Sequence, residues 1–310
     1  MELDFIQEIA FYTGISESVI KDSIYESSHY VDYYKRTFVL KRNGEFRTVF
    51  VPSPNIKKIQ HYLKEKYFSK YPISGYATAY INGKSVVDNA LPHRKSKSFL
   101  FADVHNFFNS IDFELLYQKM LPLNILDEES LRKALLVSSY KKEFVQGCVT
   151  SPILSNIYMY DFDLEIAELV KKLKNGVYTR YSDDITISSS EKIPMEILEE
   201  VRKRLSSLKL TINKRKTHFC SNIDNVRITG IRVKRNGTIS LDTEFKKSLK
   251  TRIYHCLRGD NVSNEATMEL IGLLSYLKMV DLKYYNIINA KYCLDGTPCI
   301  SRLKKMLIND

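Results

Sequence analysis

The sequence predicts an α+β fold, in which antiparallel strands are combined with helices, and three observations predict it. Residues 37–52 and 226–241 are rich in β-branched and aromatic residues, and each contains an Asn-Gly pair, a strong signal of a hairpin turn. Residues 178–190 are also of strand type and surround two adjacent acids, which suggests a third hairpin. Helical periodicity separates these hairpins, and it continues from about Thr243 to the end.

The composition is that of an ordinary globular protein. The 310 residues are 44% hydrophobic and 27% charged, enough to bury a sizeable core in one large domain or in two to three small ones. No run of eighteen apolar residues occurs, and the N-terminus carries acids in place of a basic signal region, so we expect no membrane span and no secretory signal. Five scattered cysteines without CxxC spacing indicate free thiols and a cytoplasmic location.

The charge is strongly positive. A formal net charge of +11 favours a polyanionic partner, because bound counterions are released when lysines and arginines meet phosphates. The basic residues recur in short clusters, and 21 tyrosines and 15 phenylalanines offer rings on which bases could stack. The composition therefore favours a nucleic acid as the partner.

The first third of the chain combines helices with one basic hairpin. Residues 1–35 have apolar positions at helical spacing, with a second capped start near Ser16. The hairpin of residues 37–52 follows, and then a basic amphipathic helix over 54–70. Three cations in the hairpin would suit a triphosphate or a template backbone: Lys41, Arg42 and Arg47.

The middle third begins with a strand that ends on an acid. Ser98 to Asp103 is apolar enough for a buried strand, and an aromatic turn follows it. A loop with Gln146-Gly147 leads into one long helix, expected from about Pro152 to Lys174. Three acids on that helix are expected to form a solvated face: Asp161, Asp163 and Glu165.

The adjacent acids Asp183 and Asp184 are expected at the tip of their hairpin, because successive side chains of a continuous strand would point to opposite faces. A helix over 194–208, a strand with a basic turn over 210–217, and a hairpin around Asn236-Gly237 are expected next.

Three carboxylates are therefore expected to converge. Asp103 ends one strand, and Asp183 with Asp184 lies at the turn of a hairpin 80 positions later. Three carboxylates from neighbouring strands can hold two Mg²⁺ ions, the arrangement that supports in-line phosphoryl transfer. A nucleotide polymerase palm requires such a site.

These motifs resemble those of the reverse transcriptases, over most of the chain and in the same order. The resemblance rests on the segments around Arg47, Asp103, Gln146, Asp183 and Lys216: RTVFVPS, FADVHNFF, QG with a downstream SP, YSDD and NKRKT. It implies a right-hand polymerase with fingers, a palm of antiparallel sheet plus helices, and a helical thumb. The implied domains are 1–98 for the N-terminal helices and fingers, interleaved with the palm, 99–242 for the palm, and 243–310 for a basic RNA-binding thumb.

Two further segments resemble motifs of the retron type of reverse transcriptase. Asn89-Ala-Leu-Pro-His93 is similar to an Asn-Ala-x-x-His motif, and Ile228-Thr229-Gly230 is similar to a Val-Thr-Gly triplet with Ile in place of Val. The resemblance implies that Asn89, His93, Thr229 and Gly230 contact RNA.

The resemblance also implies roles at the active site. Asp103, Asp183 and Asp184, with the Val104 carbonyl, would hold two Mg²⁺ ions. Phe108 would exclude the 2′-OH of a ribonucleotide, and Lys216 would assist departure of pyrophosphate, although Lys214 and Arg215 are alternatives. The remaining residues expected to contact dNTP or template are Arg47 with Lys41 or Arg42, Gln146, Gly147 and Tyr181.

A retron enzyme would bind a cognate structured noncoding RNA and start DNA synthesis from a guanosine 2′-OH, giving branched RNA–DNA called msDNA. Its expected partners are that RNA, its msDNA product, dNTPs, an effector protein of the same operon in anti-phage defence, and a host RNase H. Two alternatives remain open: another bacterial reverse transcriptase (group II intron-derived or diversity-generating), or a non-catalytic RNA-binding scaffold that restrains an effector. The three acids argue against a pure scaffold, which has no physical need for them.

Overall fold

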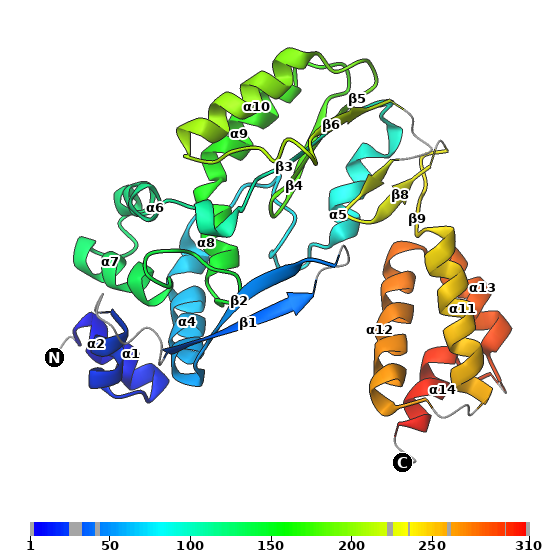
Figure 1. The fold of residues 1–310 in the computed structure, drawn as a ribbon, viewed down its shortest axis with the longest axis horizontal. Coiled ribbons are helices and arrows are strands. Elements are labelled where there is room, and N and C mark those ends of the chain that lie inside the picture. The colour runs from blue at the N-terminus through cyan, green and yellow to red at the C-terminus, as the bar shows by residue number, and fades with distance from the viewer. Residues whose placement is uncertain are drawn as a thin grey trace.

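The computed structural model describes residues 3–24, 33–40, 44–221, 226–234, 236–258, 262–294 and 296–307. The described part combines helices with antiparallel sheets of two, four and three strands, as the α+β prediction required (Figure 1). Lys41 and Arg42, expected to bind dNTP or template, lie outside the described residues.

The N-terminal elements are two short helices, a hairpin and a basic helix. Asp4 caps the first helix through a capping box with Gln7, and Gly14 ends it in the left-handed conformation. The predicted hairpin is confirmed, with Leu40 opposite Phe46. These elements are α1 (Phe5–Thr13), α2 (Glu17–Ile24), β1 (Tyr34–Leu40), β2 (Phe46–Pro52), α4 (Pro54–Lys66) and η1 (Phe68–Lys70).

The central sheet has the strand order β4-β5-β3-β6, and all its pairs are antiparallel. The third predicted hairpin forms its β4-β5 edge, and the buried strand from Ser98 lies in the middle, where both of its edges are paired. Its strands are β3 (Ser98–Asp103), β4 (Val177–Tyr181), β5 (Asp184–Ser189) and β6 (His218–Cys220).

Helices cover this sheet (Figure 1). The single long helix expected over 152–174 is wrong, because the chain breaks at Met159, whose φ of −88° and ψ of 2° are not helical. The elements between the strands are α5 (Val86–Ala90), η2 (Leu91–Lys95), η3 (Phe108–Ser110), α6 (Phe113–Met120), η4 (Leu121–Leu123), α7 (Glu128–Val137), α8 (Ser151–Tyr158), α9 (Tyr160–Val170) and α10 (Met195–Ser207).

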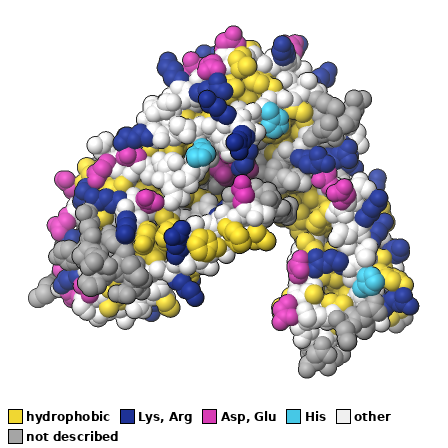
Figure 2. All heavy atoms as spheres, viewed as in Figure 1, with side chains coloured by type: hydrophobic (Ala, Val, Ile, Leu, Met, Phe, Trp, Pro, Cys, Tyr) yellow, Lys and Arg dark blue, Asp and Glu magenta, His cyan; other side chains and the backbone are white. Residues whose placement is uncertain are grey.

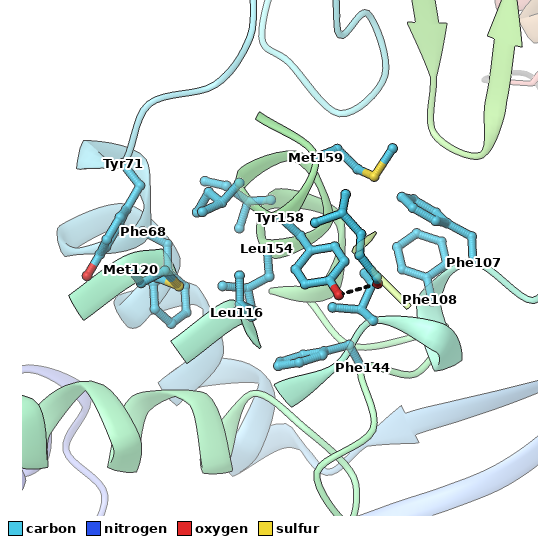
Figure 3. Packing of buried hydrophobic residues seen from close by; sticks show 14 of the residues in the cluster. Phe68, Tyr71, Phe107, Phe108, Leu116, Met120, Phe144, Leu154, Tyr158 and Met159 are labelled. Atoms are coloured by element: carbon cyan, nitrogen blue, oxygen red, sulfur yellow. Dashed lines mark hydrogen bonds between the residues drawn. The ribbon is translucent and has the colours of Figure 1, made fainter. Parts of the chain in front are cut away.

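A large apolar core joins the N-terminal helices to the central sheet. Figure 3 shows part of it, where Leu116, Leu154 and Phe144 surround the ring of Tyr158. The Tyr158 hydroxyl donates to the Leu208 carbonyl at 2.6 Å, which satisfies the one polar atom of this side chain. The central sheet therefore packs against a well-filled apolar core.

A second buried cluster contains Ala90 and Phe99 and continues from Val226 through the C-terminal helices. Residues 226–241 form a three-stranded meander with turns at Thr229-Gly230 and Asn236-Gly237, one turn more than the hairpin we expected. The elements are β7 (Arg227–Ile228), β8 (Ile231–Val233), β9 (Ile239–Ser240), α11 (Thr243–Arg258), α12 (Asn264–Val280), α13 (Leu282–Tyr292) and α14 (Cys299–Met306).

The C-terminal helices stand apart from the hairpin β1-β2, and Figure 2 shows a wide hollow between these two parts of the molecule. In the described part of the chain, we find no helix that is both long enough and apolar enough to cross a membrane.

Candidate active site

The three predicted carboxylates meet at one end of the central sheet. Asp103 is the last residue of β3 and lies directly opposite Asp184, the first residue of β5. The Val104 amide donates to the Asp183 carbonyl at 3.0 Å, so the turn of the hairpin is held against the end of β3. Residues 80 positions apart are thus brought together by strand pairing alone.

The turn between β4 and β5 has an unusual backbone. Ser182 has a φ of +59°, in the left-handed region that non-glycine residues seldom adopt. Its carbonyl accepts a hydrogen bond from Arg180 Nη1 at 3.1 Å, and its hydroxyl accepts one from the Tyr80 hydroxyl at 3.1 Å. These bonds hold the turn in the conformation that places Asp183 and Asp184.

Arg180, which bonds to this turn, belongs to a buried ion pair. Arg180 and Asp163 are both fully buried, and two bonds of 2.7 Å join the guanidinium to the carboxylate. The Tyr178 hydroxyl also donates to Asp163 at 2.6 Å, and Arg180 donates to Asn156 at 3.2 Å. The expected solvated face of α9 is therefore wrong for Asp163, whose partner in β4 the helical pattern did not reveal.

The acids repel one another in this structure. Burial, followed by the charges of Asp183 and Asp103, raises the pKa of Asp184 to about 6, although one side of Asp184 is open to solvent. Burial also raises the pKa of Asp183. Lys216 offsets part of this repulsion, since its Nζ lies 2.6 Å from Asp103 Oδ2, and that hydrogen bond raises the pKa of Lys216.

This donor set suits hard divalent cations. Carboxylate oxygens with raised pKa values gain most from a nearby positive charge. The Val104 carbonyl, expected as a further ligand, accepts no hydrogen bond from any residue that the structure describes. Within the same described residues, no group of three His, Cys, Asp or Glu side chains is placed to hold a metal ion by itself.

The Gln146-Gly147 loop contacts the hairpin β1-β2. The Phe50 amide donates to the Gln146 carbonyl at 2.8 Å. Gly147 has a φ of +111°, and a Cβ there would lie 2.2 Å from the Phe50 carbonyl oxygen. Only glycine permits this approach, so the loop sets the position of the hairpin beside the sheet.

The other residues expected to contact a nucleotide lie around the acids. Phe108 is 8% exposed, and its ring packs on those of Phe107 and Tyr80. Tyr181 is half-buried and pairs with Asp184. Burial raises the pKa of Tyr80, and the exposed Arg47 of β2 lies near enough for its charge to oppose that rise.

Two residues expected to contact RNA are instead interior. Asn89 and His93 are 0% exposed. The His93 ring bonds to the hydroxyls of Ser188 at 2.6 Å and Thr179 at 2.8 Å, and burial lowers its pKa to about 3. This burial argues against direct RNA contact by either side chain, and the His93 ring instead supports the β4-β5 hairpin through Ser188 and Thr179.

The Asn89 side chain connects Thr78 to the turn between β7 and β8. Its Nδ2 donates to Thr229 Oγ1 at 3.4 Å, and its Oδ1 accepts from Thr78 Oγ1 at 3.1 Å. Thr229 is half-buried and Gly230 is exposed, with positive φ at both. The turn that resembles a retron motif is thus tied to the sheet that carries the acids, a link that single motifs could not indicate.

A pocket of about 420 Å³ is lined by residues of that turn and by two of the acids. Its lining residues include Asp103, Asp184, Lys216, Arg227 and Thr229. The pocket combines cations with the carboxylates, which suits a phosphate-bearing ligand that approaches bound metal ions.

Comparison with known proteins identifies the class. The profile of the family described as "Reverse transcriptase (RNA-dependent DNA polymerase)" matches residues 39–233. The chain therefore belongs to the reverse transcriptase family and is an RNA-directed DNA polymerase. Reverse transcriptases generally use divalent metal ions, in agreement with the oxygen ligands gathered here.

Curated relatives narrow the class. The chain is 29% identical to the retron Ec83 reverse transcriptase of Escherichia coli, over 88% of this chain and 90% of that protein. It is 27% identical to the retron Ec73 enzyme of Escherichia coli (83% and 86% covered) and to the retron Mx65 enzyme of Myxococcus xanthus (89% and 68% covered). The resemblance to retron-type reverse transcriptases is confirmed.

A solved structure supports the fold. Telomerase from Candida albicans, in complex with a fragment of telomeric RNA, superposes with a TM-score of 0.50 at 13% identity. The match covers 89% of this chain and 63% of that one. The predicted right-hand polymerase fold is confirmed.

Proposed function

We propose that this enzyme binds a cognate structured noncoding RNA and reverse-transcribes part of it from a guanosine 2′-OH, giving branched msDNA. The observation that carries the proposal is the pairing of Asp103 with Asp184, beside Asp183 and Lys216, in a chain whose curated relatives are retron reverse transcriptases. The domains in this proposal are 1–98, 99–242 and 243–310, although the second buried core also includes Ala90, Phe99 and residues from Val226 onward.

Asp103, Asp183, Asp184 and the Val104 carbonyl would hold two Mg²⁺ ions. When bound, these ions supply charge stabilisation for the attacking hydroxyl and for the leaving pyrophosphate. The ammonium of Lys216 now neutralises Asp103 from the exposed side of the site. Released from Asp103, it would be free to donate a proton or a hydrogen bond to pyrophosphate.

The neighbouring residues position the substrates. Arg47 would contact the triphosphate, and Gln146 with Gly147 would lie along the nucleotide and template. The buried Phe108 ring would occupy the space that a 2′-OH needs. Thr229 and Gly230 would contact RNA, with Asn89 and His93 acting through the position of this turn and of the β4-β5 hairpin.

The biological setting is proposed from the retron resemblance. The product would stay with the enzyme and with an effector protein of the same operon in anti-phage defence, and a host RNase H would remove template RNA. Positioned in the cytoplasm, the enzyme would draw on cellular dNTPs.

The test is synthesis by the purified protein with its cognate RNA, dNTPs and Mg²⁺. We expect DNA that remains linked to one ribonucleotide after RNase treatment and that a 2′,5′-debranching enzyme releases. Asp183→Asn should abolish synthesis, because it replaces a carboxylate that is a proposed Mg²⁺ ligand by a neutral amide. Asp161→Asn, at an exposed acid on α9, is the matched control and should retain synthesis.

Linear DNA without a branch would overturn the retron priming mechanism and leave the polymerase intact. Full synthesis by Asp183→Asn would overturn the assignment of the metal-binding acids.

A further inference from the structure

A second surface with the chemistry of a nucleic-acid site lies on α1 and α4, at the opposite end of the molecule from α12 (Figure 1). Phe11 is 73% exposed and Tyr12 is 60% exposed, although both are large aromatic residues. Their rings meet edge to face, with centroids 5.2 Å apart. Rings this open to solvent at adjacent positions contribute little to the core, so their exposure calls for another explanation.

Helix α4 extends this aromatic surface. Tyr12 stacks on Tyr62, with ring centroids 5.4 Å apart and planes inclined by 20°. Lys58, Tyr62 and Lys66 are four residues apart and therefore lie on one face of α4, about 6 Å apart along its axis. A hypothetical Cβ on Gly14 would lie 3.9 Å from Lys58 Nζ, which places this end of the row beside α1.

The surface is positively charged. Residues 54–70 contain five lysines and one glutamate. Glu8 is an acid of α1 near these rings. Its Oε1 lies 2.9 Å from Lys66 Nζ and accepts hydrogen bonds from the hydroxyls of Tyr62 and Tyr67, so its charge is neutralised. Lys58 and Lys70 are exposed on either side, and Lys70 Nζ lies 5.5 Å from the Tyr67 ring centroid.

We propose that this surface, defined by Phe11, Tyr12, Lys58, Tyr62, Lys66 and Lys70, binds a single-stranded segment of RNA outside the hollow between the C-terminal helices and the hairpin β1-β2. Bases would stack on Phe11 and Tyr12, and phosphates would lie along the lysines, the combination by which single strands bind without sequence preference. Protein interfaces are depleted in lysine, so the charge favours RNA over a protein partner. The assignment extends the proposed function, because the cognate RNA would supply the segment.

The experiment uses the full-length protein, saturated with an unlabelled primer–template hybrid that occupies the hollow. The probe is a fluorescein-labelled 12-nucleotide oligouridylate, and its binding is followed by anisotropy. We expect Phe11→Ser to weaken binding at least fivefold, because base stacking on one ring contributes about that much or more. Lys58→Glu with Lys70→Glu should weaken binding and flatten its dependence on salt, because fewer counterions are released.

A matched control carries the same kinds of change on α10, at Met195 (58% exposed) and the exposed Lys203. Met195→Ser with Lys203→Glu should leave oligouridylate binding unchanged. Phe11→Ser keeps the Tyr12–Tyr62 stack, and its thermal unfolding midpoint will show that the variant is folded. A 4-thiouridine probe should crosslink to α1.

Unchanged binding by Phe11→Ser and by the double lysine variant would overturn this surface assignment, and so would crosslinks confined to the hollow. A role of these rings in binding a protein would give that same result. DNA synthesis on a short primer–template is a separate measurement: its absence in the unmodified protein would contradict the proposed function, whatever the oligouridylate shows.

Discussion

The pKa of Asp184, raised to about 6 by burial and by Asp183 and Asp103, has a consequence for stability. The unfolded value is about 3.9, so the folded state binds more protons between about pH 4 and 6. The stability that protonated Asp184 contributes is therefore lost as pH rises through that window, and none of this contribution remains above it. Without divalent ions, the folded protein at neutral pH carries an unfavourable charge.

Asp184→Asn should remove this cost. At pH 7.5 without divalent ions, we expect the free energy of unfolding to rise by about 1 kcal/mol, a figure reduced for solvent screening of this exposed group. At pH 4 the gain should vanish. Urea denaturation at both pH values measures it, and Asp103→Asn, which breaks the ion pair with Lys216, should give no gain. Equal effects of Asp184→Asn at both pH values would contradict the charge argument.

Phe108 provides a prediction on selectivity. Phe108→Ala should lower the preference for dNTPs over rNTPs at least about tenfold, because a buried ring no longer fills the space of the 2′-OH. Single-nucleotide competition assays measure the ratio. Phe107→Ala removes a neighbouring buried ring and is the control for general loosening. If both variants shift the ratio equally, Phe108 has no specific role as a gate.

Among the structural elements, the loop at Gly147 holds the hairpin β1-β2 against the sheet. Gly147→Ala should cost about 3 kcal/mol or more, since its Cβ would overlap the Phe50 carbonyl and its φ is positive. Gly83→Ala is the control, with φ also positive but nothing within 4 Å, and should cost about 1 kcal/mol. Chemical denaturation compares the two, and equal costs would show that the close contact with β2 is unimportant.

The α9–β4 contact gives a second prediction among these elements. Asp163→Asn should destabilise the protein by about 3–5 kcal/mol, because Arg180 is left buried without its counter-charge. Asp161→Asn, two residues away and exposed, should change stability by less than about 0.5 kcal/mol. A small effect of Asp163→Asn on the unfolding midpoint would mean that water or rearrangement compensates Arg180.

Across the whole molecule, two buried cores are joined through β7-β9 and α5. Lys246 anchors the C-terminal core: its Nζ lies 2.6 Å from both Asp281 Oδ2 and Ser240 Oγ, and 4.2 Å from the Tyr284 ring centroid. The wide hollow seen in Figure 2 lies between this core and the hairpin β1-β2.

Lys246→Met should loosen the C-terminal core selectively, because it leaves the Asp281 carboxylate largely buried without its cation. We expect faster amide hydrogen exchange in α11–α13 and unchanged protection in the central sheet. Lys250→Met, on the same helix and 5.5 Å from the Tyr284 centroid, is the control. Uniformly faster exchange throughout the chain would show that the two cores unfold as one unit.

Much of this molecule could be predicted from local pattern. Hairpins with Asn-Gly or paired acids and the strand ending at Asp103 were visible in the residues themselves. The break at Met159 and the third strand of the meander were missed, because helical and turn signals do not locate ends within a continuous pattern.

The sequence by itself determined the class of fold and enzyme, since the spacing and order of the acidic, Gln-Gly and lysine motifs are properties of the chain. Only the tertiary structure decided which polar residues are buried and what they contact. Asp163 is an ion-pair partner where a solvated acid was expected. Asn89 and His93 form hydrogen bonds inside the protein where RNA contacts were expected. The physical reason is that burial and hydrogen bonding depend on partners up to 140 positions away, which no local pattern specifies.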